Sequence, residues 1–286
     1  MTLPKSVLSM LLILPLLFGC TNETADLPIK PSTLEALEEF NVSYGDDPEQ
    51  VIDIYLPANR TVETKTLVLV HGGGWTSGDK TDMDFVKELI KQNIPDVAIA
   101  NLNYRLADED NRPFPMQIED ISAALQFIKA HRETYVISDE IGFIGISAGA
   151  HLSMLYSYAF DDAKQVNMVC SIVGPTNFTD PAYTGSDHPL FKDFTDLYGI
   201  DTSDSKFLKD VSPFHNLKSD SPPTILFNGG LDPLIPTSQG TAMRDKLTSL
   251  GIANELTIYE NAGHGWTGLQ LIDTWAKLSR FIEQHL

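Results

Sequence analysis

The stretch Ile141–Gly149, with the sequence Ile-Gly-Phe-Ile-Gly-Ile-Ser-Ala-Gly, limits the possible folds of this chain more than any other. An apolar strand pattern leads into a G-x-S-x-G turn, and a helical pattern follows at once. This strand–turn–helix order is what a nucleophile elbow requires. So tight a turn leaves no room for a Cβ two residues before or after the serine, where this chain has Gly145 and Gly149. We therefore expect Ser147 at the apex of a strained turn, beside the N–H of Ala148 at a helix start.

A G-x-S-x-G string alone is weak evidence, because an ordinary loop can contain the same residues. The order of elements in the rest of the chain adds to it. Strands are expected at 40–44, 51–56, 66–70, 97–103, from 141, at 166–173, 224–228 and 255–259, and helices at 82–92, 115–131, 151–160, 237–250 and 269–285. This alternation predicts an α/β fold, in which helices cover both faces of a mostly parallel, twisted sheet.

Two stretches depart from the alternation. The first two strands are separated by Gly-Asp-Asp-Pro at 45–48, which predicts an antiparallel hairpin at a sheet edge. Residues 174–223 are rich in Asp, Pro, Ser and Phe and have a helical pattern only near 190–198. We expect them to form a small lid-like insertion after the sixth strand.

Three polar residues follow directly after expected strands: Ser147, Asp232 and His264. In a parallel sheet the carboxyl ends of the strands all lie at the same end of the sheet, so we expect the three residues to meet there. A serine hydroxyl needs a base within hydrogen-bond reach and a third group that orients the base. Asp232 is preferred to other acids because it follows a strand in a glycine-rich turn. His264 is preferred to other histidines because it lies between two glycines at a later strand end.

The loop His71–Trp75, with the sequence His-Gly-Gly-Gly-Trp, follows the expected buried strand 66–70. Acyl transfer places negative charge on the former carbonyl oxygen, which fixed N–H donors stabilise. Consecutive glycines allow the backbone to approach a substrate closely and to direct N–H groups at it. A plain flexible loop between a strand and a helix is the alternative interpretation.

Together, the elbow, the glycine loop and the later Asp and His resemble α/β-hydrolases of the hormone-sensitive-lipase-like and feruloyl- or acetyl-esterase group, over residues 51–286. The resemblance implies the α/β-hydrolase fold and a Ser–His–Asp triad in the order in which these enzymes carry it. It also implies that the N–H groups of Gly73, Gly74 and Ala148 form the oxyanion hole.

The function that these features imply is hydrolysis of carboxylic esters through an acyl-enzyme on Ser147, with acetyl or feruloyl esters of glycans as candidate substrates. Trp75 and the sequence Gly-Asp-Lys at 78–80 also resemble kynurenine formamidases, so an amidase with the same triad stays open. A surface binding module that kept the fold without catalysis is the non-enzyme alternative.

The aromatic and basic residues near these motifs are interpreted separately. Trp75 and Trp266 are expected to shape the substrate pocket, with core packing as the alternative. The segment Tyr-Arg-Leu at 104–106 recurs in related esterases, which implies packing and a buried polar anchor. Cys170 lies in an apolar run and is expected to be buried and inert.

The N-terminus has the pattern of a signal peptide: Lys5, then the almost wholly apolar stretch 7–18, then Gly-Cys. Residues 17–20 resemble the lipobox of bacterial lipoproteins, which implies cleavage before Cys20 and its lipidation. We therefore expect a signal peptide at 1–19, a tether at 20–36 and one domain at 37–286, anchored to the membrane at the bacterial cell envelope. An ordinary secretory signal, giving a secreted or periplasmic protein, is the alternative.

Composition excludes several classes of function. The chain has 286 residues and a formal net charge of −19, with no basic stretch that could neutralise phosphates, so nucleic acid is not an expected partner. We find neither metal-ligand spacing nor a nucleotide-binding glycine pattern in the sequence, and we therefore expect no metal and no cofactor. The expected partner is a small-molecule or glycan-linked ester.

Overall fold

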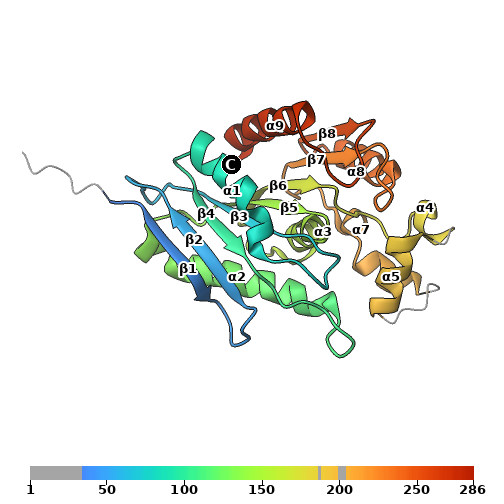
Figure 1. The fold of residues 1–286 in the computed structure, drawn as a ribbon, viewed down its shortest axis with the longest axis horizontal. Coiled ribbons are helices and arrows are strands. Elements are labelled where there is room, and N and C mark those ends of the chain that lie inside the picture. Colours follow the sequence, from blue (N-terminus) through green and yellow to red (C-terminus); the bar gives the residue numbers. More distant parts are fainter. Residues whose placement is uncertain (1–33, 186–187, 199–203) are drawn as a thin grey trace, which may run out of the picture. The chain divides into compact units, whose positions relative to one another are not determined.

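One eight-stranded sheet organises the part of the chain that the computed structural model describes, namely residues 34–185, 188–198 and 204–286. Its strands are β1 (Leu37–Ser43), β2 (Val51–Leu56), β3 (Thr66–Val70), β4 (Ala98–Leu102), β5 (Ile141–Ile146), β6 (Val166–Ile172), β7 (Thr224–Gly229) and β8 (Asn254–Tyr259). Their order is β1-β2-β4-β3-β5-β6-β7-β8 (Figure 1). β2 pairs antiparallel with β1 and β4, whereas all other neighbours are parallel. The expected mostly parallel sheet and edge hairpin are both confirmed.

Helices cover both faces of this sheet (Figure 1). They are η1 (Lys80–Met83), α1 (Asp84–Asn93), α2 (Pro113–Tyr135), α3 (Ala148–Leu155), η2 (Tyr156–Phe160), α4 (Pro181–Thr184), α5 (Pro189–Tyr198), α6 (Ser205–Asp210), α7 (Pro213–Asn216), α8 (Thr237–Ser249) and α9 (Leu269–His285). Successive strand residues point to opposite faces. In β3, Leu67 and Leu69 therefore belong to an apolar cluster shared with η1, α1 and α9, whereas Val68 and Val70 belong to the cluster shared with α2, α3 and α8.

The segment between β6 and β7 contains four short helices, α4 to α7, in its described part. The sequence pattern indicated only the one near 190–198, so that expectation was incomplete. Helices of four to six residues are too short to show a 3.6-residue apolar period. Two of them begin instead at capping aspartates: the carboxylate of Asp180 accepts from the N–H of Ala182, and that of Asp204 from Phe207. Whether the segment works as a lid stays a prediction.

Residues 1–33, which contain the expected signal peptide, most of the expected tether and Cys20, lie outside the described residues. From Leu34 to Leu286 the chain forms one compact unit. Across the described ranges, no helix has both the length and the apolar character that crossing a bilayer demands.

Candidate active site

The elbow forms as expected between β5 and α3. Ser147 has a φ of +53°, a left-handed conformation that non-glycine residues rarely adopt. A Cβ on Gly145 would lie 2.6 Å from backbone atoms of Ala150, and a Cβ on Gly149 would lie 2.2 Å from the carbonyl oxygen of Val70. Both distances are shorter than any van der Waals contact, so the steric reason for the two glycines is confirmed.

The replacement Gly149→Ala should therefore destabilise the fold. Backbone atoms block the added methyl group, and we expect a loss of about 1–3 kcal/mol in the free energy of unfolding. Urea denaturation followed by circular dichroism measures it. Gly263→Ala is the matched control, because its Cβ would meet no atom within 4 Å. Equal unfolding midpoints for the two variants would contradict the steric account.

Ser147, His264 and Asp232 are joined by hydrogen bonds where β5, β8 and β7 end. The Nε2 atom of His264 lies 2.9 Å from the Oγ of Ser147, and its Nδ1 atom lies 2.8 Å from the Oδ2 of Asp232. With its proton on Nδ1, the ring donates to the carboxylate and accepts from the hydroxyl. The expected meeting of the three residues at the carboxyl ends of the strands is confirmed. Their catalytic roles stay a prediction.

The surroundings fix the carboxylate and leave the ring accessible. The side chain of Asp232 is 0% exposed, and its Oδ1 accepts hydrogen bonds from the N–H groups of Leu234 at 2.8 Å and Ile235 at 3.1 Å. The His264 side chain is 26% exposed. A buried, fully hydrogen-bonded carboxylate behind a partly accessible imidazole can orient that ring and stabilise its protonated form.

The glycine loop lies against the elbow. A Cβ on Gly72 would be 3.2 Å from the Cβ of Ser147, and a Cβ on Gly73 would be 1.9 Å from the carbonyl oxygen of Ser77. Gly73 and Gly74 have φ values of +109° and +59°. No described residue accepts a hydrogen bond from the N–H groups of these two glycines. The N–H of Ala148 begins α3, where helix geometry provides no internal partner. These donors are therefore available to an oxyanion, and their role in an oxyanion hole stays a prediction.

A cavity of about 370 Å³ opens beside the serine. Its described lining residues are Gly72, Gly73, Gly74, Asp82, Met83, Ile146, Ser147, Leu234 and His264. Sequence reasoning missed Asp82, Met83 and Leu234. A signal existed for two of them: Asp82 and Met83 follow the glycine loop closely, in a turn opened by an aspartate cap.

Neither tryptophan expected to shape the pocket lines this cavity, and Trp75 needs a correction. Trp75 is 2% exposed and belongs to the core, and its indole N–H donates to the Nδ1 of His151 at 3.2 Å. Its φ of +67° accompanies this core position. Trp266 donates instead to the Oγ1 of Thr274 at 2.7 Å and packs on Tyr259. For Trp75 the core-packing alternative is therefore correct.

Other reactive side chains near the elbow are buried. The Nε2 of His151 lies 2.8 Å from the carbonyl oxygen of Val211, and burial lowers the pKa of this imidazole to about 4. With the indole donating to Nδ1, His151 is neutral and donates from Nε2. Cys170 is 0% exposed, as expected, and burial raises the pKa of its thiol.

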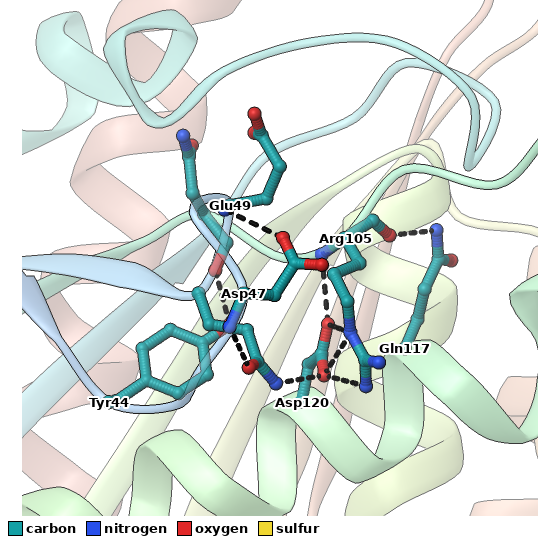
Figure 2. Close-up of polar contacts among 8 residues, drawn as sticks. Tyr44, Asp47, Glu49, Arg105, Gln117 and Asp120 are labelled. Carbon is teal, nitrogen blue, oxygen red and sulfur yellow. Dashed lines mark hydrogen bonds and ion pairs between the residues drawn. The ribbon is translucent and has the colours of Figure 1, made fainter.

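The segment 104–106 forms a buried polar anchor, as expected. The Tyr104 hydroxyl donates to the carbonyl oxygen of His71 at 2.9 Å. The Arg105 side chain pairs with Asp120, which is 0% exposed (Figure 2). The Nε2 of Gln117 donates to the carbonyl oxygens of Trp75 at 2.7 Å and Arg105 at 2.8 Å. Both ends of the glycine loop are thereby held to this anchor.

Comparisons with known proteins agree with this fold. The family model described as BD-FAE matches residues 52–247. Esterase LipC of Mycobacterium tuberculosis is 24% identical, over 79% of this chain and 59% of its own length. Carboxylesterase NlhH of the same species is 26% identical, over 82% of this chain and 77% of its own length. The solved structure of a truncated carbohydrate esterase from gut microbiota has a TM-score of 0.68 at 19% identity, covering 85% of this chain and 95% of that one.

Proposed function

We propose that this chain, which belongs to the BD-FAE family and has the α/β-hydrolase fold, hydrolyses carboxylic esters by acyl transfer to Ser147. The observation that carries the proposal is the hydrogen-bonded series Ser147, His264 and Asp232 beside a cavity lined by glycine backbone. The series gives a hydroxyl its base and gives the base an orienting carboxylate. Relatives named esterase and carboxylesterase support the same activity.

In this reaction the Oγ of Ser147 attacks the ester carbonyl carbon while His264 accepts the hydroxyl proton at Nε2. The tetrahedral intermediate collapses, the bond to the alcohol oxygen breaks, and His264 gives its proton to that oxygen. Water then attacks the acyl-enzyme with His264 again as the base, which releases the acid and restores the serine. Asp232 stabilises the imidazolium that forms twice in each cycle.

The N–H groups of Gly73, Gly74 and Ala148 stabilise the oxyanion in this proposal. Such donors contribute most when they are fixed in place before the reaction, because no reorganisation is then needed as charge develops. The anchor at 104–106 and the close contact between Gly149 and β3 supply that rigidity.

For the substrate we propose acetyl or feruloyl esters of glycans. A carbohydrate esterase from gut microbiota is among the solved structures of similar fold, which supports a glycan-linked ester. The cavity, at about 370 Å³, lies near the lower end of the usual range for ligand pockets, which favours the acetyl over the bulkier feruloyl group.

Hydrolysis of 4-nitrophenyl acetate, combined with fluorophosphonate labelling, tests the proposal. We expect turnover, loss of turnover on labelling, and a phosphonyl adduct on Ser147 in peptide mass spectrometry. Acetylated xylo-oligosaccharides and N-formylkynurenine should be compared in the same assay. Higher kcat/KM for N-formylkynurenine would favour the amidase alternative, and absence of both turnover and label would favour a binding module.

We also propose that Cys20 carries a lipid anchor at the bacterial cell envelope. Residues 17–20, Leu-Phe-Gly-Cys, are the support for it. In bacteria expressing the full chain, Cys20→Ser should abolish incorporation of labelled palmitate and move the protein out of the membrane fraction. An unchanged distribution would favour the ordinary secretory signal.

A further inference from the structure

Asp82 lines the cavity beside the serine. Among the described lining residues it is the only acid, and its side chain is exposed. The other lining side chains are the apolar Met83, Ile146 and Leu234, together with the Ser147 hydroxyl and the His264 ring, and the rest is glycine. Asp232 is buried behind the histidine and does not line the cavity. The proposed chemistry makes no use of Asp82.

The turn η1 fixes the position of this carboxylate. Asp79 caps the turn, with its carboxylate accepting from the N–H of Thr81 at 2.8 Å. The Oδ2 of Asp82 in turn accepts from the N–H of Asp79 at 3.1 Å, which completes a capping box. Within the described part of the chain, Oδ1 of Asp82 has no hydrogen-bond partner. One carboxylate oxygen is thus tied down and the other remains available to a ligand.

The turn itself is held to the end of β4. The N–H of Lys80 donates to the Oδ1 of Asn103 at 2.6 Å, and the Nδ2 of Asn101 donates to the carbonyl oxygen of Lys80 at 2.8 Å. The Nδ2 of Asn103 donates to the Oδ2 of Asp79 at 2.8 Å. The ammonium of Lys80, which is 7% exposed, donates to the Oδ1 of Asn41 at 2.7 Å. Through these bonds the Gly-Asp-Lys segment at 78–80 fixes the position of the turn that contains Asp82.

We propose that Asp82 sets the charge selectivity of this site, so that esters bearing a carboxylate near the scissile bond are disfavoured against neutral ones. The inference rests on the proposed ester hydrolysis. A sphere with the volume of the cavity is roughly 9 Å across, which is less than the screening length of about 10 Å at 0.1 M salt. A bound anionic substrate therefore lies within one screening length of Asp82, where salt screens the repulsion only in part, and such repulsion is a common source of specificity.

Asp82→Asn tests the inference, because asparagine keeps an oxygen that can accept from the Asp79 N–H while removing the charge. Two substrate pairs differ in charge at similar size. The first pair, mono(4-nitrophenyl) glutarate and 4-nitrophenyl pentanoate, varies the charge on the acyl part. The second pair, 4-acetoxybenzoate and 4-acetoxybenzamide, varies the charge on the alcohol part. We expect the ratio of kcat/KM, neutral over anionic, to fall about three- to tenfold in at least one pair.

Asp96→Asn is the matched control. Asp96 is exposed and precedes β4, so it lies at the other end of the parallel strands from the elbow. The variant changes the net charge by the same amount as Asp82→Asn. Its ratios should equal those of the wild type. Raising NaCl from about 0.02 M to 0.5 M should shrink the wild-type ratio but leave that of Asp82→Asn nearly constant.

The possible failures are distinguishable. If neutral esters are hydrolysed and Asp82→Asn leaves both ratios unchanged, the selectivity inference is overturned and the proposed function stands. Equal shifts in Asp82→Asn and Asp96→Asn would also overturn it, because net charge would then be the cause. A wild-type chain that hydrolyses none of the four esters would overturn the proposed function and the inference with it.

Discussion

Replacing Ser147 with alanine should lower kcat/KM for 4-nitrophenyl acetate by at least about 10³-fold. The variant keeps the glycine loop and the start of α3, so any residual rate would come from oxyanion stabilisation and binding alone. Alanine fits the same backbone space as serine, and we expect the unfolding midpoint to change little. The assay is initial-rate kinetics on protein purified from a host that lacks background esterase activity.

Two further variants sharpen this experiment. Ser157→Ala is the matched control, because Ser157 is buried on η2 and donates to the carbonyl oxygen of Ser153, away from the cavity lining. It should keep kcat/KM within about twofold of wild type. The double variant of Ser147 and His264 should be no slower than Ser147→Ala, because residues that act as a unit are not additive. Turnover in Ser147→Ala close to that of wild type would remove Ser147 from its proposed role.

The elbow could be predicted from the sequence because its constraint is local and steric. Gly145 and Gly149 are required by backbone atoms within a few ångströms of them, so their spacing around Ser147 already carries the information. The positions of Asp232 and His264 could be predicted from the parallel sheet, because residues that directly follow parallel strands lie together at the carboxyl ends of those strands. No long-range packing had to be known for either inference.

The lining of the cavity could not be predicted in the same way. Trp75 adjoins the glycine loop in sequence, yet its side chain enters the core and bonds to His151, a partner 76 residues away. Asp82 reaches the cavity because Asn101 and Asn103 hold its turn, and these contacts also span about twenty residues. Which neighbour of a motif faces a substrate thus depends on side-chain contacts that periodicity does not encode.

Asp120→Ala should be the most destabilising of the substitutions considered, with a loss of about 2–4 kcal/mol in the free energy of unfolding. The carboxylate is 0% exposed and accepts from the Arg105 N–H at 2.8 Å, from the Arg105 guanidinium and from the Nε2 of Gln50 at 2.7 Å. Alanine would leave all these donors without their acceptor. This expected loss is smaller than that for a fully buried ion pair, because the Arg105 side chain is 30% exposed and water can solvate it.

The same variant should also weaken catalysis. Gln117 donates to the carbonyl oxygen of Arg105 (Figure 2) and also to the carbonyl oxygen of Trp75, which ends the glycine loop. Urea denaturation gives the stability, and kcat/KM for 4-nitrophenyl acetate at a temperature well below unfolding gives the effect on the site. Glu119→Ala is the matched control, since Glu119 is exposed on the same helix and should change stability by less than about 0.5 kcal/mol. If Asp120→Ala unfolds at the same urea concentration as Glu119→Ala, the pair of Arg105 and Asp120 does not stabilise the fold. The rigidity of the oxyanion loop must then come from its other contacts, among them the bond from Tyr104 to His71 and the contact of Gly149 with β3.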